Sequence, residues 1–131
     1  MPVTPEQIHA FVWRKELRLQ GERQRLHASA AADAGRIVAL IADRYRPARI
    51  VQWGSVLDAR RFRPYSDIDL AVEGIADAER FFALLHDAES QTRFPLDIVQ
   101  LEHVEPESRE LILEKGQVVY ERDRADRAPA E

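Results

Sequence analysis

The pattern of hydrophobic and polar positions predicts four strands in the second two thirds of the chain. Short apolar runs with the length and composition of strands occupy residues 49–53, 68–72, 96–101 and 117–120. The last run is the shortest, and we expect it to be an edge strand. In the second run, Ile68, Leu70 and Val72 fall on alternate positions, so they would point together into a core.

Helical periodicity fills the segments between these strands. A long run of helix formers begins with the capping sequence at Thr4 and ends at Pro47, and it fits one long helix or two shorter ones equally well. Two further helices are predicted at about 77–90 and 106–115. Helices that alternate with strands in this way predict a compact α/β or α+β sandwich.

The first half of the long N-terminal helix has an unusual distribution of apolar residues. Its large apolar side chains wrap around much of the helix and do not form a narrow stripe; they are Ile8, Phe11, Val12, Trp13, Leu17 and Leu19. A helix that is apolar on several sides needs more than one surface to bury it. We therefore expect residues 1–28 to be a helical extension that binds a partner or self-associates, with packing onto its own domain as the alternative. Residues 29–121 would then form the main domain, and the charged residues 122–131 a disordered tail.

Composition narrows the class of protein. A length of 131 residues corresponds to about one domain, and a formal net charge of −4 gives no basic surface for nucleic acid. The chain has no cysteine, which excludes disulfides and thiolate metal sites. No apolar run reaches the roughly 20 residues of a membrane span, and the start lacks the features of a secretory signal. We therefore expect a cytoplasmic protein that does not associate with membranes.

Candidate chemistry lies at the ends of three predicted strands. The first strand ends at Gly54-Ser55, a turn whose N–H groups and hydroxyl suit a phosphate. Asp67 and Asp69 open the second strand on one face, and Asp97 lies on the third strand where an apolar residue would be expected. Carboxylates that meet repel one another unless a cation neutralises them, and magnesium prefers such oxygen ligands. If these two strands are neighbours, the pattern predicts a site for two magnesium ions and nucleotidyl transfer.

These residues resemble the motif of the minimal nucleotidyltransferases of the DNA polymerase β superfamily. The resemblance covers about residues 30–120 and rests on Gly54-Ser55, Ser66-Asp67-Ile68-Asp69-Leu70 and Asp97. It implies the nucleotidyltransferase fold, with a mixed sheet of about four strands packed by helices. It also implies that Asp67, Asp69 and Asp97 are the catalytic residues and ligands of two Mg²⁺ ions, with ATP as substrate and Gly54 and Ser55 as triphosphate contacts.

The segment between the two motifs departs from the family pattern. Eleven residues separate Ser55 from Asp67, one more than is usual, and the family's arginine does not stand at its usual place. We assign the nucleotide contact to Arg60; the alternatives are Arg61, Arg63 or no arginine contact at all. Trp53 is expected in the core, with a role in shaping the nucleotide pocket as the alternative.

Within the superfamily, the chain resembles the antitoxin half of toxin–antitoxin pairs whose toxin is a HEPN ribonuclease. That resemblance implies a nucleotidyltransferase that transfers AMP from ATP to a tyrosine hydroxyl of the toxin, an AMPylation. Two alternatives stay open. One is a catalytically impaired antitoxin that neutralises its partner by contact. The other is a homodimeric nucleotidyltransferase that acts on a small molecule or RNA.

Overall fold

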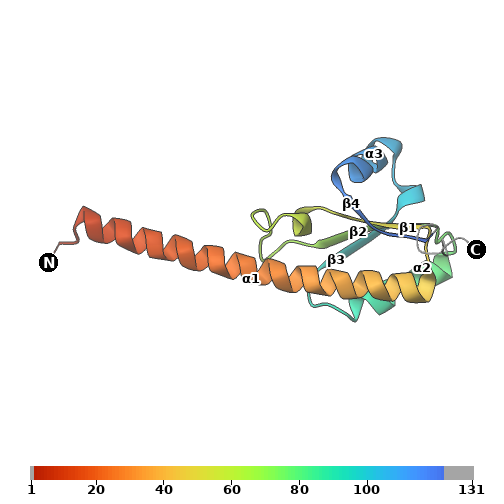
Figure 1. Cartoon of the computed structure of the whole chain (residues 1–131), viewed down its shortest axis with the longest axis horizontal. Coiled ribbons are helices and arrows are strands. Elements are labelled where there is room, and N and C mark those ends of the chain that lie inside the picture. Colours follow the sequence, from red (N-terminus) through yellow and green to blue (C-terminus); the bar gives the residue numbers. More distant parts are fainter. Residues whose placement is uncertain (1, 123–131) are drawn as a thin grey trace, which may run out of the picture.

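The computed structural model describes residues 2–122, which form three α-helices around a four-stranded sheet (Figure 1). Two short 3₁₀ turns, η1 and η2, follow the first and third strands. The elements are α1 (Pro5–Tyr45), β1 (Arg49–Trp53), η1 (Ser55–Leu57), β2 (Ile68–Glu73), α2 (Ala78–Glu89), β3 (Leu96–Gln100), η2 (Leu101–His103), α3 (Pro106–Lys115) and β4 (Gln117–Glu121). The α/β fold, the four strands and the three helical regions were all predicted, and the structure confirms them.

The sheet is mixed. Its strand order is β3-β2-β1-β4, so β4 is an edge strand, as predicted. Strands β2 and β3 are parallel, whereas β1 runs antiparallel to both β2 and β4. A parallel pair needs a crossover connection, and α2 supplies it between β2 and β3. This arrangement puts the starts of β2 and β3 beside the end of β1.

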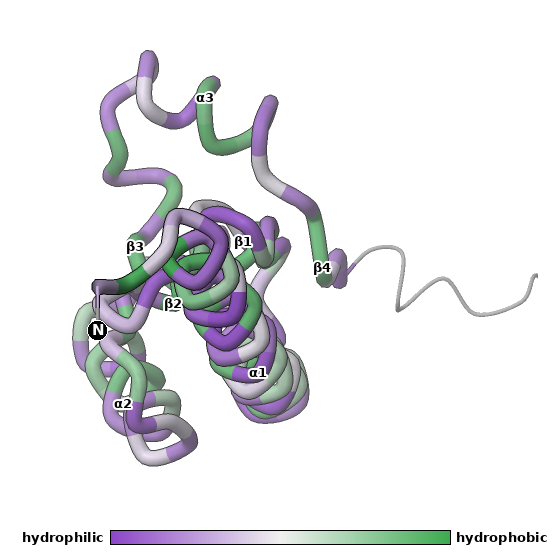
Figure 2. The backbone as a smooth tube through the Cα atoms, turned by 90° about the vertical axis from the view of Figure 1, so that its left-hand side faces the viewer, coloured by the Kyte–Doolittle hydropathy of each residue, from purple (hydrophilic) through white to green (hydrophobic). Residues whose placement is uncertain are grey.

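Helices cover both faces of the sheet. Helices α1 and α2 lie side by side on one face, and α3 lies on the other (Figure 2). The larger core lies under α1 and α2; its α1 residues, Ala30, Ala34, Ile37 and Ile41, recur at the spacing of one helix face. The smaller core lies under α3 and contains Val51, Ala71, Leu101 and Ile112.

Helix α1 is one continuous helix of 41 residues. It begins with a capping box between Thr4 and Gln7 and ends at Arg46, whose backbone is left-handed just before the buried Pro47. The sequence alone did not decide between one helix and two. Apolar contact along the second half, beginning at the buried Ala30, accounts for the continuity there.

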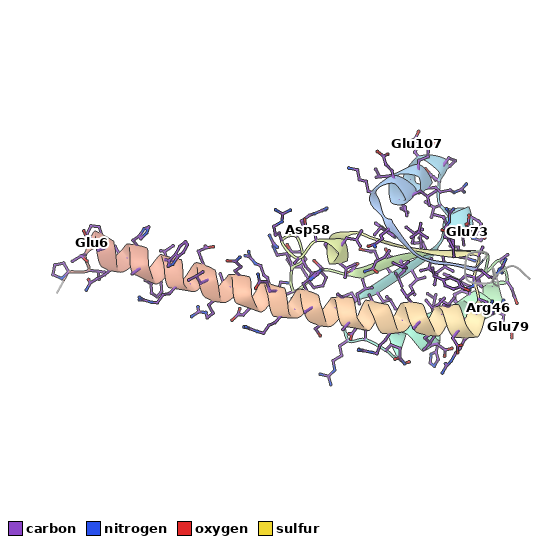
Figure 3. All side chains as sticks on the ribbon, in the orientation of Figure 1. Glu6, Arg46, Asp58, Glu73, Glu79 and Glu107 are labelled. Carbon is purple, nitrogen blue, oxygen red and sulfur yellow. The ribbon has the colours of Figure 1, made fainter. Side chains whose placement is uncertain are left out.

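The first half of α1 projects beyond the rest of the molecule (Figure 1). Its side chains stand out into open space around the helix (Figure 3), and none of residues 5–29 is buried. Exposed fractions are 52% for Ile8, 61% for Phe11, 60% for Trp13 and 50% for Leu17. These four side chains are therefore not packed on the domain, whereas Leu26 and His27 at the base of the segment contact it. The domain boundaries at residues 28 and 121 stay a prediction.

The predicted disordered tail, residues 122–131, lies outside the described residues apart from Arg122. The Arg122 backbone N–H donates to the Ala48 carbonyl at 3.0 Å, and its guanidinium donates to the Arg46 carbonyl at 3.1 Å. Within residues 2–122, no helix is long and apolar enough to cross a membrane.

Candidate active site

The structure places the predicted aspartates at one end of the sheet. Asp69 and Asp97 are register partners across the parallel β2–β3 pair, and Trp53 is the partner of Asp69 on β1. Register partners on adjacent strands point to the same face of a sheet, so these three side chains form a row across three strands. Asp67 lies two residues before Asp69, immediately before β2 begins. The face that carries the row is the one that α3 packs against, since Trp53 belongs with the smaller core.

Electrostatics shows that the three carboxylates interact. Burial, the largest cause, and the negative charges of Asp97 and Asp67 together raise the pKa of Asp69 to about 6. Asp69 is half-buried, whereas Asp97 is exposed to solvent. A carboxylate in this position is more stable when it is protonated or when a cation lies beside it.

Gly54 brings the backbone of the turn directly against Asp69. Its φ of 82° lies in the left-handed region, and a Cβ atom built on it would overlap the Asp69 carboxylate oxygen. Only glycine satisfies both the conformation and the contact. Ser55 follows as the first residue of η1. The predicted Gly-Ser turn therefore lies next to the carboxylates.

The eleven-residue segment after Ser55 is held in place by one buried aromatic ring. Phe62 is fully buried and packs edge-on against His27 of α1 and Phe94, with ring centroids 5.7 and 5.8 Å apart. His27 also shares a 2.6 Å hydrogen bond with the Val56 carbonyl of η1. The base of the projecting helix is thus hydrogen-bonded to η1, the turn that follows Gly54. Neither of these contacts of Phe62 and His27 was predicted from the sequence.

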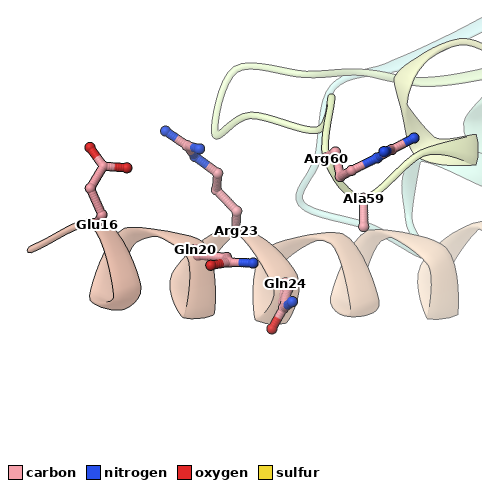
Figure 4. A pocket seen from close by; sticks show the side chains of 6 residues that line it. All are labelled: Glu16, Gln20, Arg23, Gln24, Ala59 and Arg60. Atoms are coloured by element: carbon pink, nitrogen blue, oxygen red, sulfur yellow. The ribbon is translucent and has the colours of Figure 1, made fainter. Parts of the chain in front are cut away.

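The three arginines of this segment have three different surroundings. Arg60 pairs with Asp58, with Nε 3.4 Å from the carboxylate, and its side chain is 92% exposed. It lies in a cavity against the projecting helix, together with Arg23 and Gln20 (Figure 4). Arg63 donates hydrogen bonds to the carbonyls of Arg60 and Phe62 and so closes the loop on itself. Arg61 lines a different cavity, which also contains Gly54.

That second cavity lies between η1 and α3 and has a volume of about 410 Å³. It is lined by Trp53, Gly54, Leu57, Asp58, Arg61, Ser108, Leu111, Ile112 and Lys115. Gly54, which lines this cavity, also lies against the Asp69 carboxylate. We refer to it below as the η1–α3 cavity. Trp53, expected in the core with a pocket as the alternative, belongs both to the smaller core and to this cavity.

The contribution of α3 to this cavity was not predicted from the sequence. Ser108, Leu111, Ile112 and Lys115 follow the i, i+3, i+4, i+7 spacing of one helix face. The signal was therefore present in the sequence. A short helix with only two apolar positions on that face gave no indication of what the face covers.

The donor chemistry of the aspartates fits magnesium. Carboxylate oxygens are the ligands that this hard cation prefers, and the charges that raise the Asp69 pKa would be offset by it. Within residues 2–122, no three side chains of His, Cys, Asp or Glu stand in a preformed metal-binding arrangement. Asp67, Asp69 and Asp97 thus remain predicted ligands.

Comparison with protein families identifies the fold. Residues 36–125 match the family described as "Polymerase beta, Nucleotidyltransferase". The chain belongs to this nucleotidyltransferase family. The matched range includes both predicted motifs and Asp97, so the resemblance seen in the sequence is confirmed.

Solved structures of toxin–antitoxin complexes share the fold. One, described as a toxin–antitoxin with AMP-PNP, is 22% identical with a TM-score of 0.57, over 71% of this chain and 77% of that one. Another, described as the toxin–antitoxin MntA–HepT, is 19% identical with a TM-score of 0.53, over 72% of this chain and 75% of that one. A search of curated proteins finds no significant match.

Proposed function

We propose that this nucleotidyltransferase is a magnesium-dependent protein adenylyltransferase and the antitoxin of a HEPN-type toxin. The observation that carries the proposal is the register of Asp69 and Asp97 beside Gly54, in a chain of the nucleotidyltransferase family. Fold likeness to a toxin–antitoxin with AMP-PNP supports the nucleotide and the biological setting. The reaction is the transfer of AMP from ATP to a tyrosine hydroxyl of the toxin.

The three aspartates have distinct roles in this proposal. Asp67, Asp69 and Asp97 would hold two Mg²⁺ ions, which supply charge neutralisation for the triphosphate. Gly54 and Ser55 contact the triphosphate through backbone N–H groups and the serine hydroxyl. Asp97, which is exposed, accepts the proton of the attacking tyrosine hydroxyl. The tyrosine oxygen bonds to the α-phosphorus, the bond from the α-phosphorus to the bridging oxygen breaks, and pyrophosphate leaves.

The projecting half of α1 supplies a contact surface for the toxin. Four of its large apolar side chains are at least half exposed, a state that costs free energy unless a partner covers them. Apolar residues on several sides of one helix suit insertion among the helices of an all-helical partner. The same helix reaches the turn beside Gly54, because His27 at its base is hydrogen-bonded to the Val56 carbonyl.

The test uses the chain, ATP, Mg²⁺ and the protein encoded by the neighbouring gene. Mass spectrometry of that protein should show addition of adenylyl groups, and a tyrosine-to-phenylalanine exchange at the modified position should abolish it. Asp69→Asn should remove the transfer while leaving the complex intact, as measured by size-exclusion chromatography. If the partner is modified, but the Asp69→Asn variant modifies it as fast as the wild type does, the assignment of the site is refuted.

A second candidate is neutralisation by contact alone. The observation that favours it is the separation of the apolar helix surface from the carboxylates, since such a surface binds a partner without any catalysis. Calorimetry with Mg²⁺ and ATP separates the two functions. If the protein protects cells from the partner but does not bind MgATP, the contact mechanism is supported. If the protein forms only homodimers, a nucleotidyltransferase with another acceptor is favoured.

A further inference from the structure

We infer that the η1–α3 cavity is the nucleoside pocket of this enzyme, and that Arg61 and Lys115 are its phosphate-contacting cations. The inference rests on the proposed function and specifies which of this chain's residues select the nucleotide. It differs from the prediction made from the sequence, which placed the nucleotide contact on Arg60.

The position of the cavity is the first argument. Gly54 lines the cavity on one side and touches the Asp69 carboxylate on the other. A nucleotide whose phosphates lie at Gly54 would therefore have the cavity directly beside them. A volume of about 410 Å³ falls in the usual range of small-ligand sites.

The apolar lining is the second argument. Leu57 and Leu111 are 37% and 53% exposed, and they lie on η1 and α3, the two elements that border the cavity. Trp53 and Ile112 add further apolar surface. A flat, largely apolar purine ring covers such a surface better than a sugar or an acidic side chain, since burying exposed leucine stabilises a complex at about 25 cal/mol per Å². The lining therefore favours the base of the nucleotide as the occupant.

The two cations are the third argument. Arg61 comes from the loop after η1 and Lys115 from the last turn of α3, so positive charge lies on both walls. Within the described part of the chain, neither makes a salt bridge, although Arg61 contributes to lowering the pKa of Asp58. Arg60 differs because it borders the cavity against α1 and not the η1–α3 cavity, although it pairs with Asp58, the acidic residue of the η1–α3 cavity lining. Charge on both sides of a cavity next to Gly54 suits a triphosphate.

The test compares MgATP with magnesium tripolyphosphate by calorimetry, because tripolyphosphate lacks the base. We expect Arg61→Gln and Lys115→Gln to weaken the binding of both ligands about tenfold each. Leu111→Gln, at an exposed position, should weaken MgATP several-fold and leave tripolyphosphate unchanged. Arg18→Gln on the projecting helix removes one positive charge far from the cavity and serves as the matched control.

The outcomes separate this inference from the proposed function. If Arg60→Gln weakens the binding of MgATP but Arg61→Gln and Lys115→Gln do not, the inference is overturned. The assignment made from the sequence is then restored. Equal loss of both ligands in Leu111→Gln would show that the apolar wall does not contact the base. If the wild-type chain binds neither ligand, both the inference and the proposed enzyme fail. Circular dichroism of each variant shows whether it is folded.

Discussion

Replacing Asp69 by asparagine should stabilise the fold while it removes activity. Asparagine has nearly the same size, but it carries no charge to be repelled by Asp97 and Asp67. The rise of the Asp69 pKa from 3.8 to about 6 corresponds to about 3 kcal/mol of destabilisation when the group is ionised. Because the side chain is only half-buried, solvent screening reduces this, and we expect a gain of about 1–1.5 kcal/mol.

The gain depends on pH with a definite sign. The folded protein holds the Asp69 proton more tightly than the unfolded chain does, so the wild type loses stability as pH rises from about 4 to about 6. Above that range the loss is complete and constant. Asparagine does not titrate, so its advantage should be small at pH 4.5 and full at pH 7.5. Thermal unfolding should show a midpoint increase of roughly 3–8 °C at pH 7.5.

Asp58→Asn is the matched control for loss of one negative charge. The hydrogen bond from the Arg60 backbone lowers the pKa of Asp58, which is the opposite direction, so its ionised form stabilises the fold above the unfolded pKa. Asp58→Asn should therefore be less stable than the wild type at pH 7.5. The reasoning would be refuted if Asp69→Asn lowered the unfolding temperature at pH 7.5, or if both variants raised it equally, which would indicate only a general effect of the net charge of −4.

Three further substitutions test the surroundings of the site. Gly54→Ala should destabilise the chain by about 1–3 kcal/mol in urea unfolding, because alanine is strained at a φ of 82° and its Cβ would overlap Asp69; a neutral result would contradict the close contact. His27→Ala should cost about 1–2 kcal/mol and increase amide exchange at Val56, since it removes a hydrogen bond and an edge contact with Phe62; unchanged exchange would contradict the coupling. Trp53→Phe should be neutral or slightly stabilising in the same assay, because the buried Trp53 Nε1 has no hydrogen-bond partner within residues 2–122; a loss above about 2 kcal/mol would show that the N–H is satisfied in solution.

Periodicity and capping residues predicted the elements well, because the strands and α2 have clear apolar patterns and Pro106 and Gly116 mark the limits of α3. The first strand, residues 49–53, has the predicted bounds, and α2 and α3 begin and end within a residue or so of their predicted limits. Asp69 and Asp97 could be proposed as neighbours only conditionally, because strand order and register depend on contacts far apart in the sequence.

The features that the sequence did not reveal depend on packing between distant segments. Phe62 lies among polar and charged residues, yet it is fully buried between α1 and Phe94, which lies two residues before β3. The three arginines have different surroundings because the burial of Phe62 fixes the direction in which the loop turns. The continuity of α1 could not be decided either, because helix propensity alone permits a break at Gly21 or Gly35.

The most direct test of the central claim is paramagnetic relaxation by Mn²⁺ in the presence of AMP-PNP, read by NMR on the ¹⁵N-labelled chain. The ion should broaden the amide signals of Gly54, Asp69 and Asp97 together, at Mn²⁺ concentrations well below that of the protein. Asp97→Asn should weaken the broadening at all three positions. Broadening confined to residues away from these three positions, or spread evenly over the chain, would contradict a metal–nucleotide site at the ends of these strands.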